Sequence, residues 1–177
     1  LLQPEVLRRY GRHYKTGKAI SPALIKRLQR ARNFNQGFQT VEYLASAIVD
    51  LDLHVLEDSK GLDVDNFERQ TLDSIGMPEE IVMRHRIAHF QHIIGGYAAG
   101  YYSYLWSEVM DADAFGAFEA TGDVFDAKTA RRLYETIYSA GGRRDPAAAY
   151  QAFRGRPPTT KALLAKRGLA SDGAVRH

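Results

Sequence analysis

Hydrophobic residues recur every three or four positions along most of this chain, which is the spacing of amphipathic helices rather than of strands. The longest such pattern runs from Asn35 to Glu57 and predicts a central helix. Its apolar positions are Phe38, Val41, Leu44, Ala45, Ile48, Leu51 and Val55. No segment shows a convincing alternation of apolar and polar residues, so we expect an all-α, multi-helix bundle.

Local start and stop signals predict further helices on both sides of the central one. Proline or a capping side chain marks a start and glycine marks an end. The predicted helices cover residues 4–16, 22–34, 67–75, 78–83, 97–121, 126–140 and 146–153, and a last short helix is capped by Thr159 or Thr160. Ser21 is the candidate N-cap of its helix, a capped helix is expected from Asp126, and Asp145-Pro146 is expected to open the next one. We expect one helical portion over residues 1–168 and a flexible tail over 169–177.

The stretch "HIIGGYAAGYYSYLW", residues 92–106, combines one histidine, a glycine pair and four tyrosines. On a helix that starts at Tyr97, about 100° per residue brings Tyr97, Tyr101 and Tyr104 into one stripe. The same stripe continues to Glu108 and Asp111. Such a face is either a half-buried surface whose hydroxyls reach water or a row of donors for an extended polar ligand or an oxyanion. Spacing alone leaves both interpretations open.

The Gly95-Gly96 pair directly precedes this predicted helix. Glycine accepts positive φ angles and lets a loop move, so the pair is either a tight turn or a hinge that delivers Tyr97. His92 stands just ahead of the pair, where its ring can face the same cleft as the tyrosines.

His85 and His89 have the HxxxH spacing of a helical zinc pair. Arg86, however, occupies the position where HExxH carries its general base, and a cation there opposes a bound dication. No third ligand stands nearby, so we assign no metal ligand in this chain. His13 and His54 are expected to be ordinary helix-face residues.

Other charged groups are interpreted as solvated surface. The basic turns "RGRPP" and "GGRRDP" suit a carboxylate or phosphate, but exposed loops are the simpler explanation. The carboxylates at positions 50, 52, 57 and 58 fit the exposed side and end of the central helix.

At 177 residues, with 45% hydrophobic and 25% charged residues, the chain is long enough to bury a sizeable core. Its net charge is only +3 and its basic residues are spread over several helices, so we expect no nucleic-acid partner. The absence of cysteine excludes disulfides, thiolate catalysis and cysteine-bound zinc, and it fits a reducing, cytoplasmic location. No run approaches the roughly 18 apolar residues of a membrane span, so we expect no membrane partner.

The segment "HFQHIIGGYAAGYYSYLWSEVMDADAF", residues 89–115, closely resembles the C-terminal signature of the thimet oligopeptidase family of zinc metallopeptidases. That family includes oligopeptidase A and the bacterial peptidyl-dipeptidases. Residues 33–54, 119–146 and 153–169 are similar to other segments of the family, so the resemblance covers nearly the whole chain. Its most specific part is the spacing of His92, Tyr97, Tyr101 and Tyr104.

This resemblance implies an all-helical, clam-shaped peptidase that cleaves short peptides in a deep channel, with zinc bound by HExxH and a downstream glutamate. It implies that Tyr101 and Tyr104 are catalytic, because their hydroxyls would stabilise the tetrahedral intermediate or bind the substrate backbone. The implied substrate-binding residues, on a mobile glycine loop, are His92, Gly95, Gly96 and Tyr97.

The sequence contains no HExxH, and the family segment that carries the glutamate ligand precedes the region matched here. We therefore expect a C-terminal fragment of a zinc-dependent oligopeptidase or peptidyl-dipeptidase, inactive alone, with zinc in the parent enzyme and none on this chain. Its expected partners are short peptides in the parent enzyme and the missing N-terminal part of the same protein. Exposed apolar surface also predicts a homo-oligomer. The alternative is a stand-alone helical binding or assembly protein that has lost catalysis.

Overall fold

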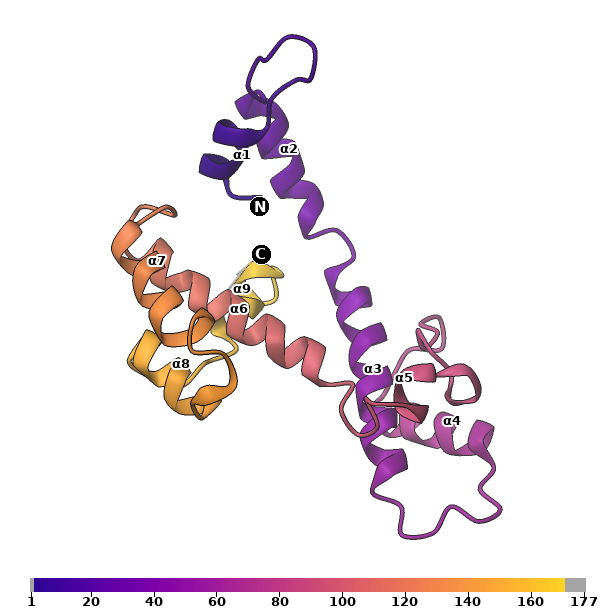
Figure 1. The fold of residues 1–177 in the computed structure, drawn as a ribbon. Coiled ribbons are helices and arrows are strands. Elements are labelled where there is room, and N and C mark those ends of the chain that lie inside the picture. Colours follow the sequence, from indigo (N-terminus) through magenta and orange to yellow (C-terminus); the bar gives the residue numbers. More distant parts are fainter. Residues whose placement is uncertain (1, 171–177) are drawn as a thin grey trace. The chain divides into compact units, whose positions relative to one another are not determined.

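The computed structural model describes residues 2–170, and every regular element within this range is helical (Figure 1). The prediction of an all-α fold is confirmed. The α-helices are α1 (Pro4–Tyr10), α2 (Pro22–Arg32), α3 (Gln36–His54), α4 (Val64–Ser74), α5 (Gln91–Ile94), α6 (Ser103–Glu119), α7 (Ala127–Leu133), α8 (Pro146–Arg154) and α9 (Lys161–Lys166). Shorter helical turns are η1 (Ile87–His89), η2 (Tyr134–Tyr138) and η3 (Gly141–Arg143). The predicted tail lies, from residue 171 onward, outside the described residues.

The chain divides into two compact units. One unit contains residues 35–107, and the described residues of the other are 2–34 and 108–170. Within the first unit, α3 runs beside α4 and α5 (Figure 1). One buried cluster joins α3 to the segment after α4: Ala45, Val49, Met83 and Ile87. A second joins α3 to α5 and the tyrosine-rich segment: Ala47, Phe90, Ile93 and Tyr101. The central helix is therefore the support on which residues 83–101 rest.

Three predicted helix starts are confirmed, and each carries a capping side chain. Side-chain oxygens of Ser21, Asp126 and Asp145 accept hydrogen bonds from the backbone N–H three residues further on, at 3.2, 2.7 and 2.8 Å. These bonds satisfy N–H groups that the first helical turn leaves without a partner. Gly155 follows α8 with φ +76°, the left-handed conformation that glycine adopts most easily. Thr160 precedes α9 without a side-chain capping bond.

The first helix is shorter than predicted. It ends at Tyr10, because residues beyond Gly11 form a turn closed by an antiparallel bridge between Arg12 and Ala19. A Cβ atom at Gly11 would lie 2.6 Å from the Leu7 carbonyl oxygen, so this tight exit from the helix requires glycine.

The short helix predicted over residues 78–83 is absent. The structure has a turn there, in which the Ile81 N–H donates to the Pro78 carbonyl at 3.0 Å. Met83, at the end of this segment, is buried in the cluster formed with α3.

In the other unit, one buried carboxylate links α6 to α8 and to the turn that follows α8. Asp113 accepts hydrogen bonds from the Tyr150 hydroxyl at 2.7 Å, Arg154 at 3.2 Å and Arg156 at 2.8 Å. The Thr159 hydroxyl also donates to it, at 3.2 Å. The interpretation of "RGRPP" as a solvated loop is wrong in this respect, because its two arginines bind a carboxylate of their own chain.

Candidate functional site

Four aromatic side chains that the sequence singled out lie together in the unit of residues 35–107. We call His92, Tyr97, Tyr101 and Tyr104 the histidine–tyrosine cluster. The ring centroid of His92 lies 5.8 Å from Tyr97, 5.1 Å from Tyr101 and 5.9 Å from Tyr104. The rings of Tyr97 and Tyr104 stack 5.3 Å apart, and the rings of Tyr101 and Tyr104 meet edge to face at 5.4 Å.

The local backbone that forms this cluster differs from the predicted one. The helix expected from Tyr97 begins only at Ser103, and a series of turns covers residues 95–102. Within these turns, Ala99 has φ +53°, which a continuous right-handed helix does not contain. His92 comes from α5, and its carbonyl accepts from the Tyr97 N–H at 3.2 Å. A folded-back loop, not one helix face, therefore brings the four rings together.

The three tyrosines of the cluster differ in exposure. Tyr101 is 3% exposed and packs against Phe90 and Tyr43, with ring centroids 4.7 and 5.1 Å away. Tyr97 and Tyr104 are 44% and 41% exposed. Hydrogen bonding to the Tyr97 hydroxyl, with a smaller effect of desolvation, raises the pKa of Tyr104. A tyrosine hydroxyl is protonated at neutral pH even without such a shift, and it can act as a hydrogen-bond donor.

The two carboxylates predicted on the same stripe have other partners. Glu108 forms an ion pair with Arg167, and Asp111 forms one with Lys166 at 3.3 Å. Both contacts lie within the unit of residues 2–34 and 108–170. Because Tyr97 and Tyr101 occupy turns before α6, the predicted stripe is interrupted, and only Tyr104, Glu108 and Asp111 lie within that helix.

The glycine pair does not use the conformational freedom that a tight turn with positive φ would need. Gly95 has φ −116°, and Gly96 is not among the glycines with positive φ. An added Cβ would meet nothing closer than 3.6 Å at Gly95 and nothing within 4 Å at Gly96. Both glycines nevertheless lie in the turns over residues 95–102, so the tight-turn interpretation agrees with the structure and the hinge stays a prediction.

The histidines of the HxxxH pattern do not form a helical pair. Residues 87–89 form the short turn η1, and the Arg86 N–H donates to the His89 ring at 3.4 Å. His85 stacks on Phe90 at 5.0 Å and lies 5.5 Å from His92. Burial, together with the nearby His92 and Arg84, lowers the pKa of His85. Among residues 2–170, no three His, Cys, Asp or Glu side chains are grouped so that they could hold a metal ion.

One residue next to the cluster was misjudged from the sequence. Asp50 was predicted to be exposed on the central helix, but it is completely buried. Its Oδ1 accepts from the Ala99 N–H and its Oδ2 from the Tyr101 N–H, both at 2.9 Å. His54 was predicted to be an ordinary helix-face residue, but its Nδ1 lies 3.0 Å from Asp50 Oδ1.

A second side chain of α3 contacts the same loop. The Tyr43 hydroxyl donates to the Tyr101 carbonyl and accepts from the Leu105 N–H at 3.3 Å. Tyr43 and Asp50 are seven residues apart, which places them on one face of a helix. Two polar residues at this spacing within an apolar pattern are the sequence signal from which their inward-facing positions could have been predicted.

The segment that leads into α5 is held at Arg86 and Ile87 by a buried carboxylate of α4. Glu68 accepts from Arg86 Nε at 2.7 Å and from the Ile87 N–H at 3.1 Å. The Arg86 guanidinium also forms an ion pair with Asp65 at 2.8 Å, and the contact with Glu68 raises the pKa of Arg86. Arg86 thus has a structural partner in the position where HExxH carries its base.

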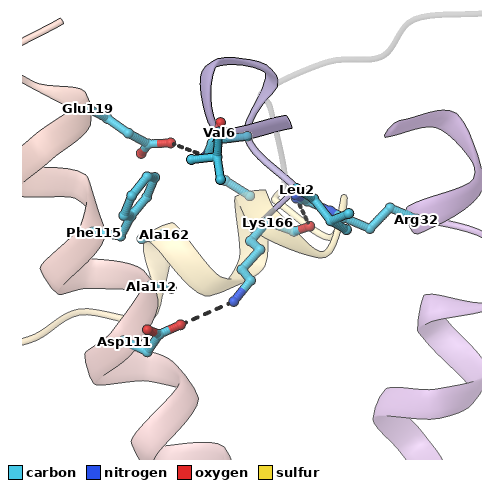
Figure 2. A pocket seen from close by; sticks show the side chains of 11 residues that line it. Leu2, Val6, Arg32, Asp111, Ala112, Phe115, Glu119, Ala162 and Lys166 are labelled. Carbon is cyan, nitrogen blue, oxygen red and sulfur yellow. Dashed lines mark hydrogen bonds and ion pairs between the residues drawn. The ribbon is translucent and has the colours of Figure 1, made fainter. Parts of the chain in front are cut away.

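A pocket of about 540 Å³ lies in the unit of residues 2–34 and 108–170 (Figure 2). Figure 2 shows the Lys166 ammonium directed toward the Asp111 carboxylate, and Gln3 donates to Glu119 at 3.3 Å. Arg32 donates to the Lys166 carbonyl. Because these polar groups bind one another, the pocket shows no convergent set of groups for a ligand, and the histidine–tyrosine cluster remains the candidate site.

Residues 2–170 thus form a helical fold in which a histidine and three phenols lie together, with two of the phenols partly exposed. Hydroxyl and imidazole groups in such a cluster can donate hydrogen bonds to a polar ligand or an oxyanion. The chain belongs to peptidase family M3, whose family model matches residues 1–169. The resemblance found in the sequence is thereby confirmed.

Several curated relatives are similar over most of this chain. Dipeptidyl carboxypeptidase of Escherichia coli (strain K12) is 36% identical over 170 residues, which cover 94% of this chain and 25% of the relative. The probable cytosolic oligopeptidase A of Arabidopsis thaliana is 37% identical over 176 residues, 96% of this chain and 25% of the relative. Saccharolysin of Saccharomyces cerevisiae (strain ATCC 204508 / S288c) is 30% identical over 159 residues, which cover 89% of this chain and 22% of the relative. The chain therefore spans about a quarter of the length of the curated relatives it matches.

Along residues 2–170, no helix combines the length and the hydrophobicity needed to cross a membrane.

Proposed function

We propose that this chain supplies the peptide-binding and transition-state-stabilising side chains of a zinc-dependent oligopeptidase or peptidyl-dipeptidase that acts on short peptides in the cytoplasm. The observation that carries this proposal is the convergence of His92, Tyr97, Tyr101 and Tyr104, with two phenol rings at the surface. Membership of the M3 family and the names of the relatives support peptide hydrolysis as the activity of the whole protein.

The proposed catalytic residues are Tyr101 and Tyr104. When water attacks a peptide bond, the carbonyl oxygen becomes an oxyanion, and a hydroxyl already directed at that position stabilises it without reorganisation. The exposure of Tyr104 favours this role, because 41% of the residue is accessible and its hydroxyl can donate a hydrogen bond. One such donor is typically worth about 3 kcal/mol of transition-state stabilisation.

The proposed substrate-binding residues precede the catalytic ones along the segment from α5 to the start of α6. His92 can contact a peptide group through its ring, and Tyr97 stacks on Tyr104 at the surface. Gly95 and Gly96 have room around them and form the proposed hinge by which this part of the loop adjusts to a peptide.

Zinc is the metal on which M3 peptidases depend, but the residues described here do not fit a zinc site. No group of three possible ligands occurs among residues 2–170, and Arg86 is engaged with Glu68. In our proposal zinc is bound by the remainder of a longer protein, which is the partner of this chain. The chain alone is then expected to be inactive, and we assign no step of the reaction to its histidines as metal ligands.

The proposal is tested by replacing Tyr104 with phenylalanine in the peptidase that contains this chain. Tyr104→Phe removes the donor but keeps the ring stacked on Tyr97, so kcat should fall about a hundredfold while KM changes little. Tyr102→Phe is the matched control, because Tyr102 is a comparably exposed neighbour outside the cluster. Equal effects on kcat and on peptide binding would reduce Tyr104 to a binding residue. Unchanged kinetics would overturn the proposal.

A further inference from the structure

We propose that Asp50 is the positioning residue of the histidine–tyrosine cluster and acts on its catalytic end through the backbone of Ala99 and Tyr101. This inference rests on the proposed function for its catalytic consequence. The contacts themselves do not depend on that function. Asp50 would touch neither substrate nor metal, so its effect would pass entirely through the position of the tyrosines.

The carboxylate of Asp50 binds the loop at two points. Its two oxygens each accept one backbone N–H, from Ala99 and Tyr101, at 2.9 Å. A bidentate contact to amides two residues apart fixes both the distance and the direction of the intervening backbone. Hydrogen bonds to an ionised acceptor are about twice as strong as neutral ones, and this acceptor is completely buried.

These contacts explain why the tyrosine segment is not helical. In an α-helix from Tyr97 onward, the N–H of Tyr101 would bond to the carbonyl four residues earlier, that of Tyr97. In the structure Asp50 takes this N–H, and the Tyr97 carbonyl accepts from the Gly100 N–H instead, at 2.9 Å. The helix can then start only after this loop. The non-helical turn is what places the ring of Tyr97 on that of Tyr104.

The Asp50 carboxylate is itself held in place. His54 Nδ1 lies 2.7 Å from the Asp50 carbonyl oxygen and 3.0 Å from its Oδ1. Both of these atoms are acceptors, so Nδ1 carries the proton. Among the described residues, no buried side-chain nitrogen or oxygen lacks a hydrogen-bond partner. The carboxylate therefore has little freedom to turn away from the loop.

Tyr101 is gripped from its other side by Tyr43. The Tyr43 hydroxyl donates to the Tyr101 carbonyl, while Asp50 accepts its N–H. Both polar groups of one backbone unit are thus bound by side chains of α3. Donors to an oxyanion must be placed to within a fraction of an ångström, because a displacement of 1 Å can cost about a hundredfold in rate. Precise placement of the Tyr101 and Tyr104 hydroxyls is what this double contact would provide.

The first test uses this chain as it stands. Asp50→Asn keeps the shape but replaces one acceptor oxygen by an NH2 group that faces a backbone N–H. We expect the amides of Ala99 and Tyr101 to exchange with solvent at least about tenfold faster, as measured by NMR, because one charged hydrogen bond is lost. Asp113→Asn, the loss of a buried carboxylate in the other unit, measures what lower stability alone does to these two amides, and Asp50→Asn should speed their exchange more than Asp113→Asn does. Unchanged exchange in Asp50→Asn would overturn the proposal.

The second test is a double-mutant cycle on turnover in the peptidase that contains this chain. Asp50→Asn should lower kcat at least about tenfold, corrected for the folded fraction. If Asp50 acts through Tyr104, this loss should shrink to about twofold in a Tyr104→Phe background and stay complete in a Tyr102→Phe background. A purely structural role would give the same loss in both backgrounds, and that result would overturn the positioning role.

If Asp50→Asn does not fold, Tyr43→Phe replaces it. This variant removes the hydroxyl that donates to the Tyr101 carbonyl and accepts from the Leu105 N–H, and it keeps the ring stacked at 5.1 Å. Faster exchange is then expected at the Leu105 amide, with the same dependence of turnover on Tyr104. The two proposals fail differently. If Tyr104→Phe leaves kcat intact, the proposed function is wrong, and the positioning role of Asp50 is wrong as well. If Tyr104→Phe lowers kcat and the effect of Asp50→Asn is fully additive, only the positioning role is wrong.

Discussion

The buried carboxylate of Asp113 allows a quantitative prediction of stability. Replacing Asp113 with alanine removes the acceptor of four donors that come from α8 and the turn after it. Two of these donors have little access to water, since Tyr150 is 7% exposed and the Arg154 side chain is 16% exposed. The Arg156 side chain is 43% exposed and can be hydrated instead, so we discount its contribution.

The expected cost follows from the two poorly hydrated donors. A hydrogen bond to a charged group contributes about 1.5 to 3 kcal/mol, and a buried arginine left without its carboxylate is costly in itself. We therefore expect Asp113→Ala to lower the free energy of unfolding by about 3 to 4 kcal/mol at pH 7.

The contribution of Asp113 should also depend on pH. Burial alone would raise the pKa of Asp113, but hydrogen bonds from Arg156, Tyr150 and Arg154 hold it far below its ordinary value of 3.8. A carboxyl whose pKa is lowered by folding stabilises the fold above its unfolded pKa, and this stabilisation is lost as the pH falls toward the folded pKa. Between pH 7 and pH 3 the wild-type chain should lose about 1 kcal/mol from this group, and Asp113→Ala should not.

Urea unfolding followed by far-UV circular dichroism measures both effects. The control is Glu5→Ala in the same unit, because Glu5 forms an exposed ion pair with Arg8 that should contribute about 0.5 kcal/mol or less. If the free energy of unfolding of Asp113→Ala lies within about 1 kcal/mol of that of Glu5→Ala, the prediction is wrong. It is also wrong if the difference between wild type and Asp113→Ala does not narrow at pH 3.

Two further predictions use the same physical arguments. Glu68→Gln should speed hydrogen exchange at the Ile87 amide about tenfold, because a charged acceptor for Arg86 and this N–H is lost; exchange equal to wild type by NMR would contradict it. The homo-oligomer is proposed to form through the apolar surface of α2, where Leu24 and Leu28 remain exposed. Light scattering should therefore find an assembly that Leu28→Lys dissociates, whereas a monomeric wild-type chain would show that this surface does not drive association.

The parts of the fold that the sequence predicted correctly are those set by neighbouring residues. The starts of α2, α7 and α8 follow from capping bonds that reach only three residues along the chain. The central helix follows from a long apolar pattern, and it is observed as Gln36–His54. Such local interactions are visible in the sequence because both partners lie in the same short window.

The errors occur where distant residues decide the backbone. The tyrosine segment was predicted as helix from its own spacing, but Asp50, about fifty residues earlier, takes two of its N–H groups. Residues 78–83 likewise form no helix, and Met83 at their end is buried against α3. A single sequence does not show which carboxylate will be buried. A polar residue in a helical pattern is more often exposed, and Asp50 was assigned accordingly.

The candidate site therefore combines information from two parts of the chain. The side chains of His92, Tyr97 and Tyr104 come from the recognisable segment, and the sequence predicted that they would lie together. Their actual arrangement depends on α3, because Asp50 of that helix holds the folded-back loop. A continuous helix over the same residues would carry Tyr97 and Tyr104 on one face but would not fold back to stack their rings. It follows that the segment alone does not define the site. A chain that kept all four aromatic residues but had no carboxylate matching Asp50 would retain the motif and be free to lose the geometry that the motif requires.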